Sequence, residues 1–336
     1  MAETYRFALV GNPNVGKSSL FNALTGLHQH TGNWPGKTVA TAAGTCSIDG
    51  AAVELIDLPG TYSLSARSPE EEVAAEYISF GCADAVIVVC DATALERNLY
   101  LALQVMEITD HVVICVNLMD EAGKRGITVD LPRLSQLLGV RVVGTSARQK
   151  KTLPALLRAA VAAAQERHRK PIPVRYGEAI EAGLDELLPG SMPNHRWIAM
   201  QLLTGGDTAI CALEKKLGRP LEEDPFLSEA VRLGRERIDR AGETAAAAAT
   251  MLLRRAADIA AEVVSAAHQN GFSRDRKADR ILTGKKFGIP IMLLLLLILF
   301  YLTVQGANYP SAFLSSMLFS FGDILSRWLL AAGIPL

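Results

Sequence analysis

The residues best suited to chemistry lie near the amino terminus, where residues 11–18 read GNPNVGKS. Glycines at both ends let the backbone curl tightly, so that its N–H groups point at the oxygens of a phosphate. In this spacing Lys17 reaches the β- and γ-phosphates of a nucleotide, Ser18 ligates Mg²⁺, and the following helix offers its positive end to the anion. We predict a phosphate-binding loop, and a chance glycine-rich turn is the alternative. Its nucleotide-binding residues are Gly11, Asn12, Pro13, Asn14, Val15, Gly16, Lys17, Ser18 and Ser19.

A second group of residues, DLPG at 57–60, can complete the contacts to the metal and the phosphates. Asp57 can hold Mg²⁺ through a water molecule, and Gly60 lets the backbone approach the γ-phosphate. Because that contact is lost on hydrolysis, the segment after it is expected to move. Thr38 is the candidate for coordinating the metal from the opposite side. The alternative is that Thr38 is an ordinary loop threonine. We therefore expect Ser18, Thr38 and Asp57 to contact Mg²⁺, and the nucleotide site to include Gly36, Lys37, Leu58 and Pro59.

Two further motifs indicate which base the nucleotide carries. NLMD at 117–120 follows a strand-like run, and the Asp120 carboxylate can accept both the ring N–H and the exocyclic amine of guanine. Adenine presents the wrong pattern, and sites built on such pairing reject a mismatched analogue because buried groups would go unpaired. TSA at 145–147 can turn the Ala147 N–H toward the guanine O6. The motifs stand at carboxyl ends of predicted strands, where α/β sheets bind ligands. The predicted base-site residues are Asn117, Leu118, Met119, Asp120, Thr145, Ser146 and Ala147.

To position these motifs, the first half of the chain must alternate strands and helices, which is typical of an α/β domain with a mostly parallel sheet. Strands are expected at 5–10, 42–48, 52–56, 85–90, 112–116 and 140–144. Helices are expected at 17–26, 69–80, 95–108, 130–138 and 152–168. The turn signal Asp49-Gly50 joins two of the strands in a hairpin, so we expect one antiparallel edge strand on the sheet.

The α/β domain is assigned to residues 1–168, and PIP at 171–173 marks a linker. Residues 174–270 lack strand alternation, and residues 243–264 contain an alanine run of high intrinsic helicity. We predict an all-α helical domain over 174–270. A basic, polar neck follows at 271–286.

The segment from 287 to 307 contains no charged residue and is long enough to cross a bilayer core, which needs about 20 residues. Lys285 and Lys286 just before it place the preceding part of the chain in the cytoplasm. An apolar stripe at 311–328 is interrupted by polar residues, which favours an amphipathic helix at the membrane interface. We expect the membrane domain to be truncated after this point.

Charge and cysteine spacing argue against a nucleic-acid partner and against a zinc site. The formal net charge of −1 provides no basic field for nucleic acid. The five cysteines are widely spaced, without a C-x-x-C pair, so they are expected to be reduced thiols and not zinc ligands.

With these motifs in this order, the chain resembles the TRAFAC GTPases and, more closely, the FeoB family of ferrous iron transport proteins. The phrases GNPNVGKSSLFNALTG, TGNWPGKTV, DLPGTYSL and VNLMDEA carry the resemblance, which covers essentially the whole chain. It implies a Ras-like G domain, a helical domain that supports nucleotide binding, and a polytopic α-helical membrane domain of which only the start is present. Lys37 and Ala40 depart from the residues that are common in the family.

The resemblance also implies how hydrolysis is assisted. Ras-type enzymes orient the attacking water with a glutamine after D-x-x-G, but Thr61 stands there, and no arginine within the switch segments is a clear finger. The family instead uses K⁺, which implies Asn14 as a ligand together with backbone carbonyls of Gly32 and Trp34, for electrostatic stabilisation. A turn residue is the alternative for Asn14. The expected catalytic residues are Asn14, Lys17, Thr38 and Gly60.

The function implied is a GTP-binding and GTP-hydrolysing cytoplasmic module that gates or regulates Fe²⁺ uptake. GTP/GDP, Mg²⁺ and K⁺ are the expected ligands, with slow, potassium-activated turnover. The implied partners are the lipid bilayer, the carboxyl-terminal membrane domain, small accessory Feo proteins and a second copy of the chain, without nucleic acid. The implied location is the bacterial inner membrane, with the G and helical domains in the cytoplasm. The alternative is a GTPase switch that recruits a protein or RNA partner without transport.

Overall fold

The structure is a computed structural model that describes residues 4–26, 29–33, 39–65, 68–81, 83–166, 170–187, 194–204, 214, 220, 223, 225–266 and 288–331. The chain divides into two compact units, residues 1–267 and residues 268–336. The α/β and helical regions therefore belong to one unit.

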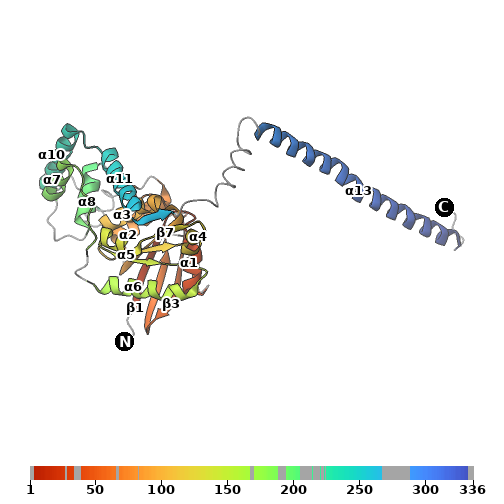
Figure 1. The fold of residues 1–336 in the computed structure, drawn as a ribbon, viewed down its shortest axis with the longest axis horizontal. Coiled ribbons are helices and arrows are strands. Elements are labelled where there is room, and N and C mark those ends of the chain that lie inside the picture. The colour runs from red at the N-terminus through yellow and green to blue at the C-terminus, as the bar shows by residue number, and fades with distance from the viewer. Residues whose placement is uncertain are drawn as a thin grey trace. The chain divides into compact units, whose positions relative to one another are not determined.

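A seven-stranded sheet forms the centre of the first unit (Figure 1), with the strand order β2-β3-β4-β1-β5-β6-β8. β1 is parallel to β4 and β5, β5 to β6, and β6 to β8. The carboxyl ends of these five strands therefore meet at one edge, and the prediction of a mostly parallel α/β sheet is confirmed. The strands are β1 (Thr4–Gly11), β2 (Gln29–Asn33), β3 (Ala40–Ile48), β4 (Ala51–Asp57), β5 (Ala85–Asp91), β6 (Val112–Asn117) and β8 (Arg141–Gly144).

The reversed strand of this sheet is β3, which is antiparallel to both β2 and β4. One antiparallel strand is as predicted, but its place at the edge is wrong, because β2 pairs on its outer side. The sequence of β2, QHTGN, carries no apolar alternation that would reveal a strand. The β3–β4 turn consists of Asp49 and Gly50 with φ of 50° and 87°, as a two-residue hairpin turn requires.

Helices cover both faces of the sheet, as alternate residues of β1 show. Phe7 and Leu9 share a hydrophobic cluster with α1 (Lys17–Thr25) and α6 (Leu153–Gln165). Ala8 and Val10 share the opposite cluster with helices α2 (Pro69–Phe80), α3 (Leu95–Ile108) and α5 (Leu131–Leu138). All four β1 side chains are fully buried. Because both faces are covered, a central strand such as β5 reads as a continuous apolar run, AVIVVCD.

The helical region contains the described helices α7 (Glu178–Leu187), α8 (His195–Thr204), α10 (Pro225–Ala241) and α11 (Ala245–Val263). Their buried side chains belong to the same hydrophobic cluster as those of α2, α3 and α5. The helical region therefore packs on that face of the α/β region. The stretch 243–264, whose alanine run indicates a helix, contains α11.

A small second sheet also joins the two regions. β7 (Ile127–Val129) lies shortly after α4 (Met119–Lys124) and pairs antiparallel with β9 (Val264–Ala266), directly after α11. The hydroxyls of Thr128 and Ser265 are 2.6 Å apart, and the Asp130 N–H donates to the Val263 carbonyl at 2.9 Å. The prediction that 174–270 lacks strands is wrong at β9, because a three-residue strand shows no alternation and its partner lies far away in sequence.

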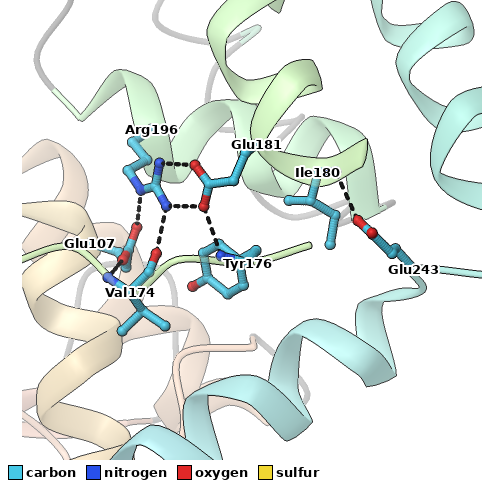
Figure 2. A network of polar contacts seen from close by, with 7 residues as sticks. All are labelled: Glu107, Val174, Tyr176, Ile180, Glu181, Arg196 and Glu243. Atoms are coloured by element: carbon cyan, nitrogen blue, oxygen red, sulfur yellow. Dashed lines mark hydrogen bonds and ion pairs between the residues drawn. The ribbon is translucent and has the colours of Figure 1, made fainter. Parts of the chain in front are cut away.

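A polar network centred on Arg196 of α8 also links these regions (Figure 2). Its guanidinium donates to Glu107 of α3 at 2.8 Å, to both carboxylate oxygens of Glu181 of α7 at 2.9 and 3.0 Å, and to the Val174 carbonyl at 2.6 Å. The Val174 N–H returns a bond to Glu107 at 3.1 Å. Burial raises the pKa of Glu107, and Arg196 opposes that shift. The junction between the two regions therefore depends on the buried Glu107 carboxylate, whose charge Arg196 neutralises.

The second unit contains α13 (Gly288–Ala331), which runs through both the 287–307 and 311–328 segments that were predicted as separate helices. The hydroxyls of Ser316 and Ser320 donate to carbonyls one turn back, at 2.8 Å each, so these polar residues require no break in the helix. Many large apolar side chains of α13 are exposed. The predicted neck at 271–286 lies outside the described residues.

Within the described part of the chain, no helix combines the length and the apolar character that crossing a membrane requires.

Candidate nucleotide-binding site

The predicted phosphate loop connects β1 to α1 at the carboxyl edge of the sheet. Gly11 ends β1, and a side chain there would place its Cβ 2.6 Å from the Val89 carbonyl oxygen. Gly16 precedes α1 with φ of 81°, and its Cβ would lie 2.7 Å from the Asn117 amide nitrogen. Both glycines are therefore required by the tight curl of the backbone.

Between these glycines, the loop presents different side chains to solvent and to the interior. Asn14 is exposed and has φ of 67°, a left-handed conformation that asparagine tolerates better than most residues. This backbone geometry agrees with the turn interpretation of Asn14 and leaves its side chain accessible to a ligand. Asn12 and Val15 are buried, with 1% and 2% exposure.

Lys17 lies beside the residues that follow β4. Its Nζ contacts Asp57 Oδ1 and donates to the Leu58 carbonyl at 2.5 Å. Burial raises the pKa of Asp57, and the Lys17 ammonium opposes the shift. Ser18, the second residue of α1, is exposed. A hydroxyl and a carboxylate are the hard oxygen donors that Mg²⁺ prefers, so Ser18 and Asp57 suit this cation.

The DLPGT segment packs directly on the phosphate loop. The Leu58 N–H donates to the Leu9 carbonyl at 3.0 Å, and the Thr61 N–H donates to the Gly11 carbonyl at 3.2 Å. The Thr61 hydroxyl is turned inward, where it donates to the Ser63 carbonyl at 2.7 Å. This hydroxyl is therefore engaged within its own turn and does not replace the glutamine of Ras-type enzymes.

Asn117, at the end of β6, joins two loops. Its side chain is fully buried, and its amide donates to the Val15 carbonyl of the phosphate loop at 3.0 Å. Its oxygen accepts the Thr145 hydroxyl at 3.2 Å. The side chain therefore holds the phosphate loop and the 145–147 loop together, and it faces the interior.

The predicted base-recognition residues meet at the same edge. Ser146 donates its hydroxyl to Asp120 Oδ1 at 2.8 Å, which holds the pKa of Asp120 below its usual range. The Met119 N–H donates to the Thr145 carbonyl at 3.2 Å, and Leu118 turns the chain with φ of 61°. The site thus presents an ionised carboxylate, which can accept two N–H donors at once.

Five of the predicted site residues come from the stretch 32–38 of the sequence. Trp34, Gly36, Lys37 and Thr38 lie outside the described residues. Gly32 is in edge strand β2, opposite Thr41, and within the described contacts no hydrogen bond links it to Asn14.

The sequence motifs missed Arg97, in the first turn of α3. Its guanidinium carbon lies 5.1 Å from the centre of the Tyr62 ring, and its carbonyl accepts a bond from Asn12 of the phosphate loop at 3.4 Å. A signal was present, because α3 follows β5, whose carboxyl end lies at the same sheet edge. An arginine in the first turn after such a strand is a candidate for the site.

Comparisons with known proteins agree with this geometry. The family model for "Ferrous iron transport protein B" matches residues 5–160. The "Fe(2+) transport protein A/Fe(2+) transporter FeoB fusion protein" of Porphyromonas gingivalis is 34% identical over 343 residues, which cover 96% of this chain and 40% of that protein. The chain spans about two fifths of the length of the curated relatives it matches.

Solved structures match more than three quarters of the chain. The cytosolic domain of the T. maritima FeoB iron transporter in a GDP form is 33% identical, with a TM-score of 0.65, and the match covers 78% of this chain and 100% of that one. The same domain in a GMPPNP form has 33% identity and a TM-score of 0.64, with 78% and 99% coverage. Both nucleotides in these structures carry guanine.

Proposed function

The chain belongs to the ferrous iron transport protein B family, and from this membership we propose that it binds GTP and hydrolyses it to GDP and phosphate. The observation that carries the proposal is the joining of two motifs at one sheet edge. Asn117 ties the phosphate loop to the loop that holds Ser146, and the Ser146 hydroxyl donates a hydrogen bond to the Asp120 carboxylate. A guanine can thus pair with Asp120 while its phosphates meet the loop amides and Lys17.

The chain's own residues supply most of the proposed chemistry. The phosphate-loop N–H groups and Lys17 bind and orient the phosphates, and Gly60 lets the backbone approach the γ-phosphate. Ser18, Thr38 and Asp57 are the proposed Mg²⁺ ligands, and Asn14 is the proposed K⁺ ligand with the carbonyls of Gly32 and Trp34. Bound cations would offset the charge that develops on the phosphate oxygens.

Slow turnover is part of the proposal, because no glutamine follows Gly60 and the Thr61 hydroxyl is bonded to Ser63. The test is GTP turnover by the full chain with Mg²⁺, in KCl and in NaCl. Turnover should be faster in KCl, and N14A should abolish the difference. Equal rates of the unaltered chain in both salts would remove K⁺ from the mechanism, and no GTP turnover in either would refute the hydrolase assignment.

We further propose that this module gates or regulates Fe²⁺ uptake by a larger membrane protein. The support is that the relatives are named Fe(2+) transporters and are more than twice as long as their matched part. The proposed partners are a carboxyl-terminal membrane domain, the lipid bilayer, small accessory Feo proteins and a second copy of the chain. The proposed location is the bacterial inner membrane, with the first unit in the cytoplasm. No observation favours the alternative of a switch without transport.

Iron uptake by a bacterial mutant that lacks its own transporter tests this second step. The full chain is joined to the remaining part of the P. gingivalis relative, with and without K17A. We expect uptake with the unaltered chain and little with K17A, because Lys17 is placed at the phosphates. Equal uptake by both would show that the nucleotide site does not control transport.

A further inference from the structure

Two successive residues of the DLPGTY segment, Gly60 and Thr61, lie against the phosphate loop, and the next residue, Tyr62, contacts helix α3. A Cβ on Gly60 would lie 3.4 Å from Pro13 Cα, so this backbone packs closely on the phosphate loop. The Thr61 N–H donates to the Gly11 carbonyl at 3.2 Å. Tyr62, which comes next, contacts no phosphate-loop residue among the described contacts and instead lies under the Arg97 guanidinium at 5.1 Å.

Arg97 is itself held in place from two sides. Leu95 and Leu99 in the same turns of α3 are buried, with 2% and 0% exposure, which anchors the helix to the core. The Arg97 carbonyl accepts a bond from the buried Asn12 amide at 3.4 Å. The Asn12 side chain has little freedom, because it is 1% exposed. The Arg97 backbone is thus fixed relative to the phosphate loop.

The Tyr62 ring, by contrast, is held on few sides. It is 49% exposed, so core packing alone does not fix it. A guanidinium over a tyrosine ring within about 6 Å is attractive, because the ring face carries negative charge. Arg97 is therefore well placed to restrain Tyr62, and through Tyr62 to restrain the two residues before it.

We propose that Arg97 is a positioning residue for the hydrolysis of GTP, and the inference rests on the proposed GTPase function. Its guanidinium holds Tyr62, and Tyr62 keeps Gly60 and Thr61 against the phosphate loop. In this position the backbone at Gly60 can contact the γ-phosphate of GTP. Arg97 acts through Tyr62 and not on the phosphate.

The size of the effect distinguishes this role from that of a catalytic arginine. The interaction free energy of an exposed cation–π contact corresponds to a change in rate of about two- to fivefold. An arginine that neutralises charge on the transferred phosphate changes kcat by about 10³–10⁵-fold. We therefore expect R97A to lower kcat about two- to fivefold, with GDP affinity changed less than twofold.

The experiment measures kcat, KM and GDP affinity of the full chain for R97A, Y62L, Y62F and the double variant R97A/Y62L. Y62L should match R97A, and the double variant should be no worse than either, because both remove one contact. Y62F keeps the ring and should behave as the unaltered chain. The matched control is R158A, which removes an exposed arginine that pairs with Asp49 away from this site and should leave kcat unchanged.

A second readout does not depend on hydrolysis. Hydrogen exchange of residues 60–65 should be about two- to fivefold faster in R97A and in Y62L than in the unaltered chain, Y62F or R158A, because the Thr61 N–H is released. The inference is overturned by unchanged kcat and exchange in R97A, by additive losses in the double variant, or by an R97A loss far above that of Y62L. An unaltered chain without GTP turnover refutes the proposed function itself, and the exchange data then still decide whether Arg97 restrains this segment.

Discussion

Replacing Arg196 with methionine is expected to weaken the junction between the α/β and helical regions, because it leaves a buried carboxylate without its partner. The Glu107 side chain is 8% exposed, and Arg196 is 22% exposed. Removing one member of a buried ion pair typically costs about 3–5 kcal/mol. Glu181 is 28% exposed and can turn to water. We therefore expect the low end of this range, about 3 kcal/mol, in the free energy of unfolding.

The cost of R196M should depend on pH with a definite sign. Burial raises the pKa of Glu107 in the folded state, and Arg196 opposes the shift. A carboxyl group whose pKa is raised in the folded state lowers the free energy of unfolding as the pH rises. The loss begins near the pKa of the unfolded state, about 4.3, and is complete above the pKa of the folded state. Without Arg196 only the hydrogen bond from the Val174 N–H still opposes the effect of burial, so this pH window extends to higher pH. R196M should thus be more costly at pH 8 than at pH 5.

Urea unfolding of the full chain at both pH values measures this cost. Trp197 is a suitable reporter, because it adjoins Arg196, is 7% exposed, and its ring centre lies 6.4 Å from that of Phe80 of α2. The chain has three tryptophans, so the other two, Trp34 and Trp328, are changed to phenylalanine in every variant.

Two further variants decide the cause. R196M/E107Q should recover about 1–2 kcal/mol at pH 8 and lose most of the pH dependence, because no buried charge remains. R232M removes an exposed arginine on α10 that pairs with Glu229 and Glu236, and it should leave the free energy of unfolding almost unchanged. The reasoning is refuted if R196M costs the same at pH 5 and pH 8 and E107Q brings no recovery.

Further expectations concern the nucleotide site and one thiol. D120N should weaken GDP binding about 10–100-fold and improve xanthine nucleotides relative to guanine ones, which competition binding measures; an unchanged preference would remove Asp120 from base recognition. S146A, which removes the hydroxyl bonded to Asp120, should weaken GDP binding about fivefold in the same assay, and an unchanged affinity would make that bond irrelevant. G16A should weaken GDP binding more than S146A, because φ is 81° and the Cβ meets Asn117; wild-type affinity would contradict the described loop. Burial raises the pKa of Cys46 to about 11, so its alkylation at pH 8, followed by peptide mass spectrometry, should be about 100-fold slower than that of free cysteine, and an equal rate would contradict this burial.

The elements that carry the motifs could be predicted because their signals are local. β5 and β6 are buried apolar runs, and the loop glycines at 11 and 16 belong to one motif of eight consecutive residues. From the sequence alone, the carboxyl-edge rule predicts that Asp57, Asp120 and Ser146 belong to one site.

The features that escaped prediction depend on distant partners. β2 and β9 are short and carry no alternation, and each becomes a strand only through its pairing with β3 or β7. Arg97 belongs to no motif, and its place beside Tyr62 follows from the packing of α3 on the sheet. The inward role of Asn117 likewise depends on a loop 102 residues earlier in the chain. Such contacts are properties of the assembled fold.

The central claim is that the Asp120 carboxylate and the phosphate loop together select a guanine nucleotide. Titration calorimetry of the full chain with GDP and with ADP, each with Mg²⁺, tests it most directly. We predict that GDP binds at least about 10⁴-fold more tightly than ADP, because buried polar groups would go unpaired with adenine. Tight binding of ADP without measurable binding of GDP would contradict the account.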